Sequence, residues 1–161
     1  MRGHGTRSTG HRSAGSGSAG IDWVLLTSEA VDNTQELLHL VDVYRARWTI
    51  EEFFKALETG CSFLKRQLEH YESLVNALAV SAPIAAKALE LRSRARQHSD
   101  STDIILDADH LLLLREKGHM KLPDEPTNRD ILLAVAALGG HIKWNGEPGW
   151  KTICGGLEKL R

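Results

Sequence analysis

The sequence has few cysteines, no excess of one charge and no apolar stretch at its N-terminus. Cys61 and Cys154 are the two cysteines in 161 residues, too few for a disulfide framework, which favours a reduced, cytoplasmic setting. We expect no secretory signal, no apolar run long enough to span a membrane and no membrane partner. The 20 Lys and Arg residues are balanced by 21 Asp and Glu residues. This is not the balance of a dedicated nucleic-acid-binding domain, so any contact with nucleic acid has to be local.

Common catalytic and metal motifs are also missing. The histidines are scattered and form no HExxH pattern, and the two cysteines form no CxxC pattern. The pairs Gly139-Gly140 and Gly155-Gly156 are typical of helix punctuation and not of a phosphate-binding loop. No Ser/His/Asp arrangement can be argued from the order of these residues along the chain.

The first twenty residues consist mostly of Gly, Ser, Arg, His and Thr. Such a composition has almost nothing to bury and is typical of a flexible linker. We predict that residues 1–20 are a disordered leader or tag, either an expression leader or a vector-derived linker. The alternative is a basic DNA-binding arm, because Arg2, Arg7 and Arg12 precede any acidic residue.

The rest of the chain is predicted to be mainly α-helical with one short strand. Residues 21–28 are apolar on both faces after Trp23, which favours an inner strand of a sheet. Hydrophobic periodicity and capping residues predict helices from Thr34 to about Arg47, over 72–96, 107–117 and 128–138, and from Trp150 to the end. Thr49 and Glu52 have capping-box spacing, so the first helix could restart there, and Pro83 should kink or split the second.

Four chemically active side chains recur at helical spacing within residues 44–58. Tyr44, Arg47, Glu51 and Lys55 are three or four residues apart and fall within an arc of about 80° on a continuous helix. A neighbouring arc is apolar and is expected to enter a core; it contains Val43, Ala46, Ile50, Phe53, Phe54 and Leu57.

Side chains of these types suit a phosphate backbone and a divalent cation. Arg and Lys bind phosphate, a Tyr hydroxyl donates to a phosphate oxygen, and a carboxylate suits Mg²⁺. The plainer interpretation is that Glu51 lies on a solvated face and pairs with Lys55 one turn later. A break at Thr49 would also remove the alignment of Tyr44 and Arg47 with Glu51.

The same residues carry a resemblance to a known family. Tyr44, Arg47 and Glu51 match most of the Y-(2)-R-(3)-E-(6)-K signature of the Tn5-like (IS4-type) DDE transposases, although Glu58 stands where the family has lysine. Lys55 also resembles a DNA-contacting lysine of that family. The surrounding sequence is similar too, in the segments Trp23-Val-Leu-Leu-Thr, Thr59-Gly60-Cys61, Lys65-Arg66-Gln67-Leu68-Glu69, Leu138-Gly139-Gly140 and Pro148-Gly149-Trp150.

Residues 21–161 therefore resemble the C-terminal third of such a transposase. The resemblance implies that 21–97 form the C-terminal end of an RNase H-like DDE catalytic domain and that 98–161 form a helical C-terminal dimerisation domain. Transposon-end double-stranded DNA and a second copy of the chain are the implied partners, in a bacterial cytoplasm and on the nucleoid when bound to DNA. The alternative is a non-catalytic helical interaction module.

The resemblance also assigns roles to single residues. Glu51 corresponds to the third of three carboxylates that hold two Mg²⁺ ions for phosphoryl transfer on DNA. The other two lie far upstream in the family, and neither Asp22 nor Asp42 is in a family position. We therefore expect this chain alone not to cleave or transfer DNA, and an independent metal enzyme remains a third possibility.

The implied DNA contacts lie on both sides of Glu51. Arg47, Tyr44 and Lys55 resemble residues that hold phosphates near the transferred end. Trp23, which could also be a packing residue, corresponds to a Trp that stacks on a flipped base. Lys65 and Arg66 could compensate for the acidic Glu58.

Overall fold

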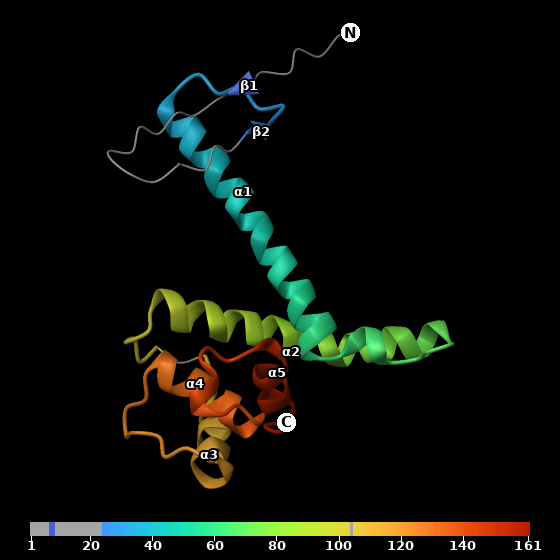
Figure 1. Ribbon diagram of the computed structural model, residues 1–161, viewed down its shortest axis with the longest axis vertical. Helices are drawn as coiled ribbons and strands as arrows, with labels where there is room; N and C mark the ends of the chain where they lie inside the picture. Colours follow the sequence, from blue (N-terminus) through green and yellow to red (C-terminus); the bar gives the residue numbers. More distant parts are fainter. Residues whose placement is uncertain (1–6, 9–23, 104) are drawn as a thin grey trace. The chain divides into compact units, whose positions relative to one another are not determined.

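In a computed structural model of the protein, residues 7–8, 24–103 and 105–161 are described. They divide into two compact units, residues 1–48 and residues 49–161, each of which is described by itself. The prediction of a mainly α-helical chain is confirmed, since five α-helices account for most of the described residues (Figure 1). Trp23 lies outside the described residues.

The first unit contains a short antiparallel strand pair. β1 (Arg7–Ser8) pairs with β2 (Leu25–Leu26), with Arg7 opposite Leu26 and Ser8 opposite Leu25. The strand predicted over 21–28 is therefore present but only two residues long where it is described. Leu26 is 86% exposed, so β2 is not the inner strand that its apolar sequence predicted. Its partner β1 comes from the segment predicted to be a leader.

Helix α1 (Thr34–Lys55) begins one residue earlier than a cap at Thr34 would imply. The Asn33 carboxamide oxygen accepts from the backbone N–H of Gln35 and of Glu36, both at 2.9 Å, so Asn33 performs the capping role expected of Thr34. The predicted restart at Thr49 does not occur. No Gly or Pro lies near Thr49 to interrupt the backbone, and capping-box spacing alone does not break a helix.

The apolar face of α1 does not enter a core as predicted. None of the 22 residues of α1, all of which are described, is buried. Val43, Ile50 and Phe54 are 50–58% exposed. The predicted core face is buried only at its end, where Leu57 lies in the following turn. The described residues supply no layer of side chains to cover the remainder of this face.

A turn of π-helix, η1 (Ala56–Gly60), follows α1 and leads into η2 (Phe63–Lys65). The helical run ends at Gly60, and Ser62 then adopts a left-handed backbone with φ of 52°. A Cβ at Gly60 would lie 2.4 Å from the Cys154 sulfur. A residue larger than glycine therefore does not fit at this turn without a shift of the neighbouring core.

Helix α2 (Tyr71–Gln97) is a single element, so Pro83 does not split it. Because proline has no N–H, the carbonyl of Ala79 loses its helical hydrogen bond. Both residues are exposed, so water can satisfy that carbonyl. By length and composition α2 could cross a membrane, contrary to our expectation that no run would qualify. Six of its 27 residues are buried within the chain, and a single helix of this kind is weak evidence for a membrane span.

The C-terminal helices lie close to their predicted positions. They are α3 (Ala108–Lys117), α4 (Asn128–Leu138), the 3₁₀ turn η3 (Lys143–Asn145) and α5 (Trp150–Glu158). The Asp107 carboxylate accepts from the His110 N–H at 2.9 Å. Thr127 and Asp130 form a reciprocal capping box at the start of α4. Local capping chemistry is therefore sufficient to locate these helices from sequence.

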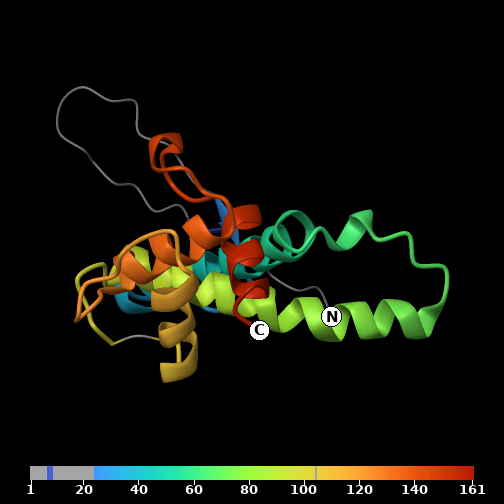
Figure 2. The ribbon, with the colours of Figure 1, turned by 90° about the horizontal axis from the view of Figure 1, so that it is seen from below.

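The core of the second unit is built around α4 and α5. Both helices lie beside the C-terminal half of α2 in Figures 1 and 2. The backbones of α4 and α5 approach closely, because a Cβ at Gly156 would lie 1.9 Å from the Val135 carbonyl oxygen and one at Gly139 would lie 1.8 Å from that of Thr152. The core takes residues from both sides of position 97, where we predicted a domain boundary; they include Leu91, Leu114, Ile131, Leu132 and Ile153.

Candidate functional site

The four predicted site residues Tyr44, Arg47, Glu51 and Lys55 all lie on α1. Tyr44 and Glu51 are half-buried, and Arg47 and Lys55 are exposed. The boundary between the two units falls after position 48, so Tyr44 and Arg47 belong to the first unit and Glu51 and Lys55 to the second. The joint use of the four residues stays a prediction that rests on the continuity of α1.

The residue after Glu51 on α1 is also a glutamate, Glu52. Glu52 accepts from the Arg96 guanidinium of α2 at 3.5 Å, so it takes part in the structure of the second unit. This pair holds the last turns of α1 against the end of α2. The metal-binding role of Glu51 stays a prediction.

The described residues do not by themselves make a magnesium site at Glu51. Magnesium requires close to six oxygen ligands, and a pair of ions requires several carboxylates. Within residues 24–103 and 105–161, no group of three or more His, Cys, Asp or Glu residues is arranged to hold a metal ion. Glu51 supplies one carboxylate of the three that the resemblance implies.

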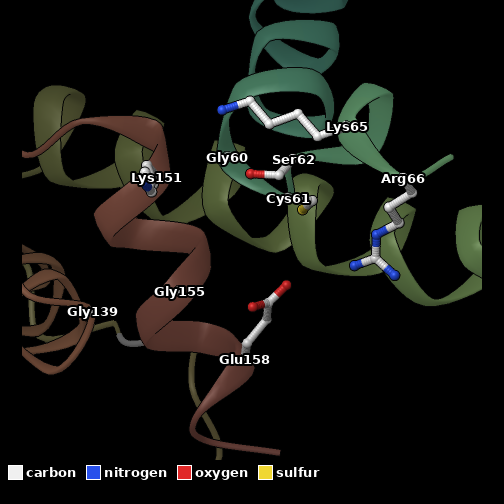
Figure 3. A pocket seen from close by; sticks show the side chains of 9 residues that line it. All are labelled: Gly60, Cys61, Ser62, Lys65, Arg66, Gly139, Lys151, Gly155 and Glu158. Atoms are coloured by element: carbon white, nitrogen blue, oxygen red, sulfur yellow. The ribbon is translucent and has the colours of Figure 1, made fainter.

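Lys65 and Arg66 lie at a cleft of about 390 Å³ in the second unit (Figure 3). The residues lining it come from the η1–η2 turn, from the end of α4 and from α5; they are Gly60, Cys61, Ser62, Lys65, Arg66, Gly139, Lys151, Gly155 and Glu158. Three of them are cationic side chains and one is a carboxylate. The arrangement provides a positively charged, open cavity suited to an anionic group.

Lys151 is a cleft residue that the sequence analysis missed. It lies in the first turn of α5, directly after Trp150. The helix dipole disfavours a cation at this end of a helix. That misplacement is a signal in the sequence that could have marked Lys151 as a functional candidate.

One of the two cysteines, Cys61, lines this cleft, whereas Cys154 does not. Cys61 and Cys154 are both buried, and their thiols donate to the carbonyls of Ser81 and Ala56 at 3.5 and 3.7 Å. A hydrogen bond between the two thiols lowers the pKa of Cys61 against the opposing effect of burial. The same bond, together with burial, raises the pKa of Cys154. Cys154 is therefore a neutral core thiol.

The arginines at the end of α2 are engaged within the second unit. The Arg92 guanidinium lies over the Trp150 ring, 4.3 Å from its centroid, and burial lowers the pKa of Arg92. Arg94 pairs with Glu90 at 3.2 Å and with Asp103 at 3.1 Å. These contacts favour the structural interpretation of this basic cluster over a phosphate-contacting patch.

Glu58 is exposed on η1. The position where the resembled family has a lysine therefore presents a carboxylate to solvent. Compensation for this charge by Lys65 and Arg66 stays a prediction. The other predicted DNA contact, Trp23, lies outside the described residues.

A comparison with known families places a match in the N-terminal half of the chain. Residues 4–83 match the family model described as the transposase DDE domain. The matched segment covers nearly half of the chain and ends within α2. It includes Glu51 and the six predicted DNA contacts, whereas Lys151 lies outside it. It also begins within the segment that we predicted to be a leader.

Proposed function

The match supports a DDE transposase, and on this premise we propose that the chain is the C-terminal portion of a cut-and-paste DNA transposase of the Tn5-like (IS4) type. One observation carries this proposal. The matched segment contains Glu51 on a helix with Tyr44 and Arg47 at the spacing of the family signature. In the full-length transposase, here called the parent, Glu51 would be the third DDE carboxylate.

Glu51 would contribute carboxylate oxygens to Mg²⁺, which activates the attacking oxygen and stabilises phosphoryl-transfer charge when it is bound. Arg47 and Lys55, both exposed, would bind backbone phosphates on either side of Glu51, and the Tyr44 hydroxyl would donate to a phosphate oxygen. Trp23 would stack on a flipped base. Such phosphate contacts position DNA without reading its sequence. We place the parent in the bacterial cytoplasm, on the nucleoid when it is bound to DNA.

The helical residues 98–161 are proposed to bring two copies together. Most of their apolar side chains are buried within the chain, but Leu112, Ile142 and Trp144 are 58–90% exposed. A homodimer would bury such side chains at its interface. Light scattering behind size-exclusion chromatography tests this part, and a strictly monomeric chain at high micromolar concentration would contradict it.

The DNA contact is tested with two neighbouring arginines of α1. The full chain is titrated into fluorescently labelled duplex at several salt concentrations, with Arg47→Ala and Arg45→Ala as the variants. Arg45 is the matched control because it is an exposed arginine of the same helix that pairs with Asp42 at 3.6 Å. Loss of one phosphate contact should reduce the slope of log affinity against log salt by about 0.9.

We expect Arg47→Ala to weaken duplex binding about tenfold and Arg45→Ala to change it less than about twofold, since one is a phosphate contact and the other is not. Equal effects of the two variants would contradict the proposed phosphate contact of Arg47 on α1. Absence of salt-dependent binding by the unsubstituted chain would favour the alternative function, a helical interaction module.

That alternative has a specific observation in its favour. Of the large hydrophobic side chains exposed in the described residues, all but three lie between Val24 and Val80, and a partner protein could cover such a surface. The third possibility, an independent metal enzyme, predicts Mg²⁺-dependent nicking of supercoiled plasmid by this chain. We expect no nicking, because one DDE carboxylate cannot position a pair of ions.

A further inference from the structure

We propose that the cleft between the η1–η2 turn and α5 binds a backbone phosphate of double-stranded DNA, and that Lys151 holds this phosphate together with Lys65. The inference rests on the proposed DNA-binding function. It extends the DNA surface from the segment that matches the DDE domain to a helix near the C-terminus. Lys151 thereby becomes a DNA-binding residue outside the matched segment.

The cleft brings together cations that are distant in sequence. Lys65 lies at the end of η2, Arg66 follows it, and Lys151 lies in the first turn of α5. All three line the same cleft of about 390 Å³. In Figure 3 the Lys65 side chain extends along the rim toward the side on which Lys151 lies, with the Ser62 hydroxyl on that same side. Gly139 and Gly155 also line the cleft.

The three cations are not used by the protein's own structure. Among residues 24–103 and 105–161, no ion pair is formed by Lys65, Arg66 or Lys151. Other arginines of the second unit have intramolecular partners, and these are Arg92, Arg94, Arg96, Arg115 and Arg129. The cleft has three cations and one carboxylate, Glu158, so a bound phosphate would reduce the remaining repulsion between the cations.

The position of Lys151 also lacks a structural explanation. A lysine in the first turn of a helix interacts unfavourably with the helix dipole. Its side chain is exposed, so it stabilises no core. An anion in the cleft would accept from the ammonium group and face the positive end of α5 at the same time.

Glu158 limits where the phosphate can lie. It is the only carboxylate that lines the cleft among the described residues, and it comes from the last turn of α5. Figure 3 shows its carboxylate on the Arg66 side of the cleft, away from Lys65. Repulsion by Glu158 therefore favours the end of the cleft that is bounded by Lys65, Ser62 and Lys151.

The test uses the full chain and labelled duplex, with three variants measured by fluorescence anisotropy at several salt concentrations. Lys151→Gln removes the proposed contact, and Lys121→Gln removes an exposed lysine that does not line the cleft. Glu158→Gln removes the repulsive carboxylate. Thermal unfolding of each variant checks the fold, which exposed substitutions of this kind should preserve.

We expect Lys151→Gln to weaken duplex binding about fivefold and to reduce the salt slope by about 0.9, as for the loss of one phosphate contact. Glu158→Gln should tighten binding by about twofold because it relieves repulsion, and Lys121→Gln should leave binding unchanged. An unchanged Lys151→Gln variant, in a chain whose binding is lost with Arg47→Ala, would overturn this inference and leave the proposed function intact. A chain that binds no duplex at all would overturn both.

Discussion

Apolar side chains are exposed along helix α1 but buried along helix α4. Helix α1 has 22 residues, none of them buried, whereas α4 has eleven residues of which seven are buried. Both sequences carry an apolar face at helical spacing. The difference is that α4 packs with α2 and α5, while the described residues offer no layer for α1. An amphipathic pattern therefore specifies a helix, but burial requires a partner.

The contrast follows the boundary of the DDE match. The matched segment ends at residue 83, and the buried residues of α2 run from Ser81 to Ala95. Most of the exposed large hydrophobic side chains thus lie within the matched segment, whereas most of the buried core lies beyond it.

The largest expected effect is the loss of stability when a buried leucine of α2 is truncated, compared with an exposed leucine of the same helix. Leu91 of α2 is fully buried, and Leu78 is 41% exposed. Leu91→Ala should lower the free energy of unfolding by about 3 kcal/mol, because it leaves a cavity in the core. Leu78→Ala should lower it by less than about 0.5 kcal/mol. Chemical denaturation monitored by circular dichroism measures both, and comparable losses would show that the exposed half is packed in solution.

The next largest effect compares two adjacent glycines of α5. A Cβ at Gly156 would lie 1.9 Å from the Val135 carbonyl oxygen, whereas one at Gly155 meets only ordinary contacts at 3.9 Å. Gly156→Ala should destabilise the chain by about 2–3 kcal/mol through overpacking. Gly155→Ala should be neutral or stabilise it by up to about 1 kcal/mol through helix propensity.

Thermal unfolding distinguishes these two glycine variants. Equal stability would contradict the close approach of α4 and α5. A loss confined to Gly156→Ala would show that this approach is the tightest constraint in the second unit.

A smaller effect is expected when the N-terminal caps of α4 and α1 are removed. Thr127 caps α4 through a reciprocal pair with Asp130, and Asn33 caps α1 through two hydrogen bonds. Each cap is worth about 1 kcal/mol. Thr127→Ala should lower the global unfolding free energy by that amount, because α4 lies in the cooperative core. Asn33→Ala should instead raise hydrogen exchange locally in the first turns of α1 and leave global unfolding almost unchanged.

Helix positions in the second unit could be predicted because their signals are local. Asp107 and Thr127 stand directly before α3 and α4, and Gly118 and Gly139 stand directly after them. Each cap satisfies backbone groups that lie within three or four residues of it. No knowledge of the tertiary structure is needed to find such boundaries.

Features that depend on distant parts of the chain were predicted poorly. The apolar face containing Val43, Ile50 and Phe54 was expected in a core, but its burial depends on packing partners that the local sequence does not specify. The cleft itself was not predicted; Lys65 and Arg66 were singled out from the sequence as DNA contacts, whereas Lys151 joins them only through the packing of α5. A single side chain brought in by tertiary contact leaves no periodicity in the sequence.

The smallest expected effect concerns an ion pair at the surface of the second unit. Arg129 of α4 makes two hydrogen bonds to the Glu147 carboxylate, and these bonds lower the pKa of Glu147 below its usual value. A depressed pKa means that the pair stabilises the folded chain above the unfolded pKa of about 4.3, and that this contribution is lost as the pH falls through the folded pKa.

Glu147→Gln should therefore cost about 0.5 kcal/mol at pH 7, as for an exposed pair. Its deficit should vanish in strong acid, whereas the control Glu29→Gln in the first unit should leave stability unchanged. Thermal unfolding of the three proteins across the acid range measures this, and a deficit that persists at the lowest pH would assign the effect of Glu147 to packing and not to charge.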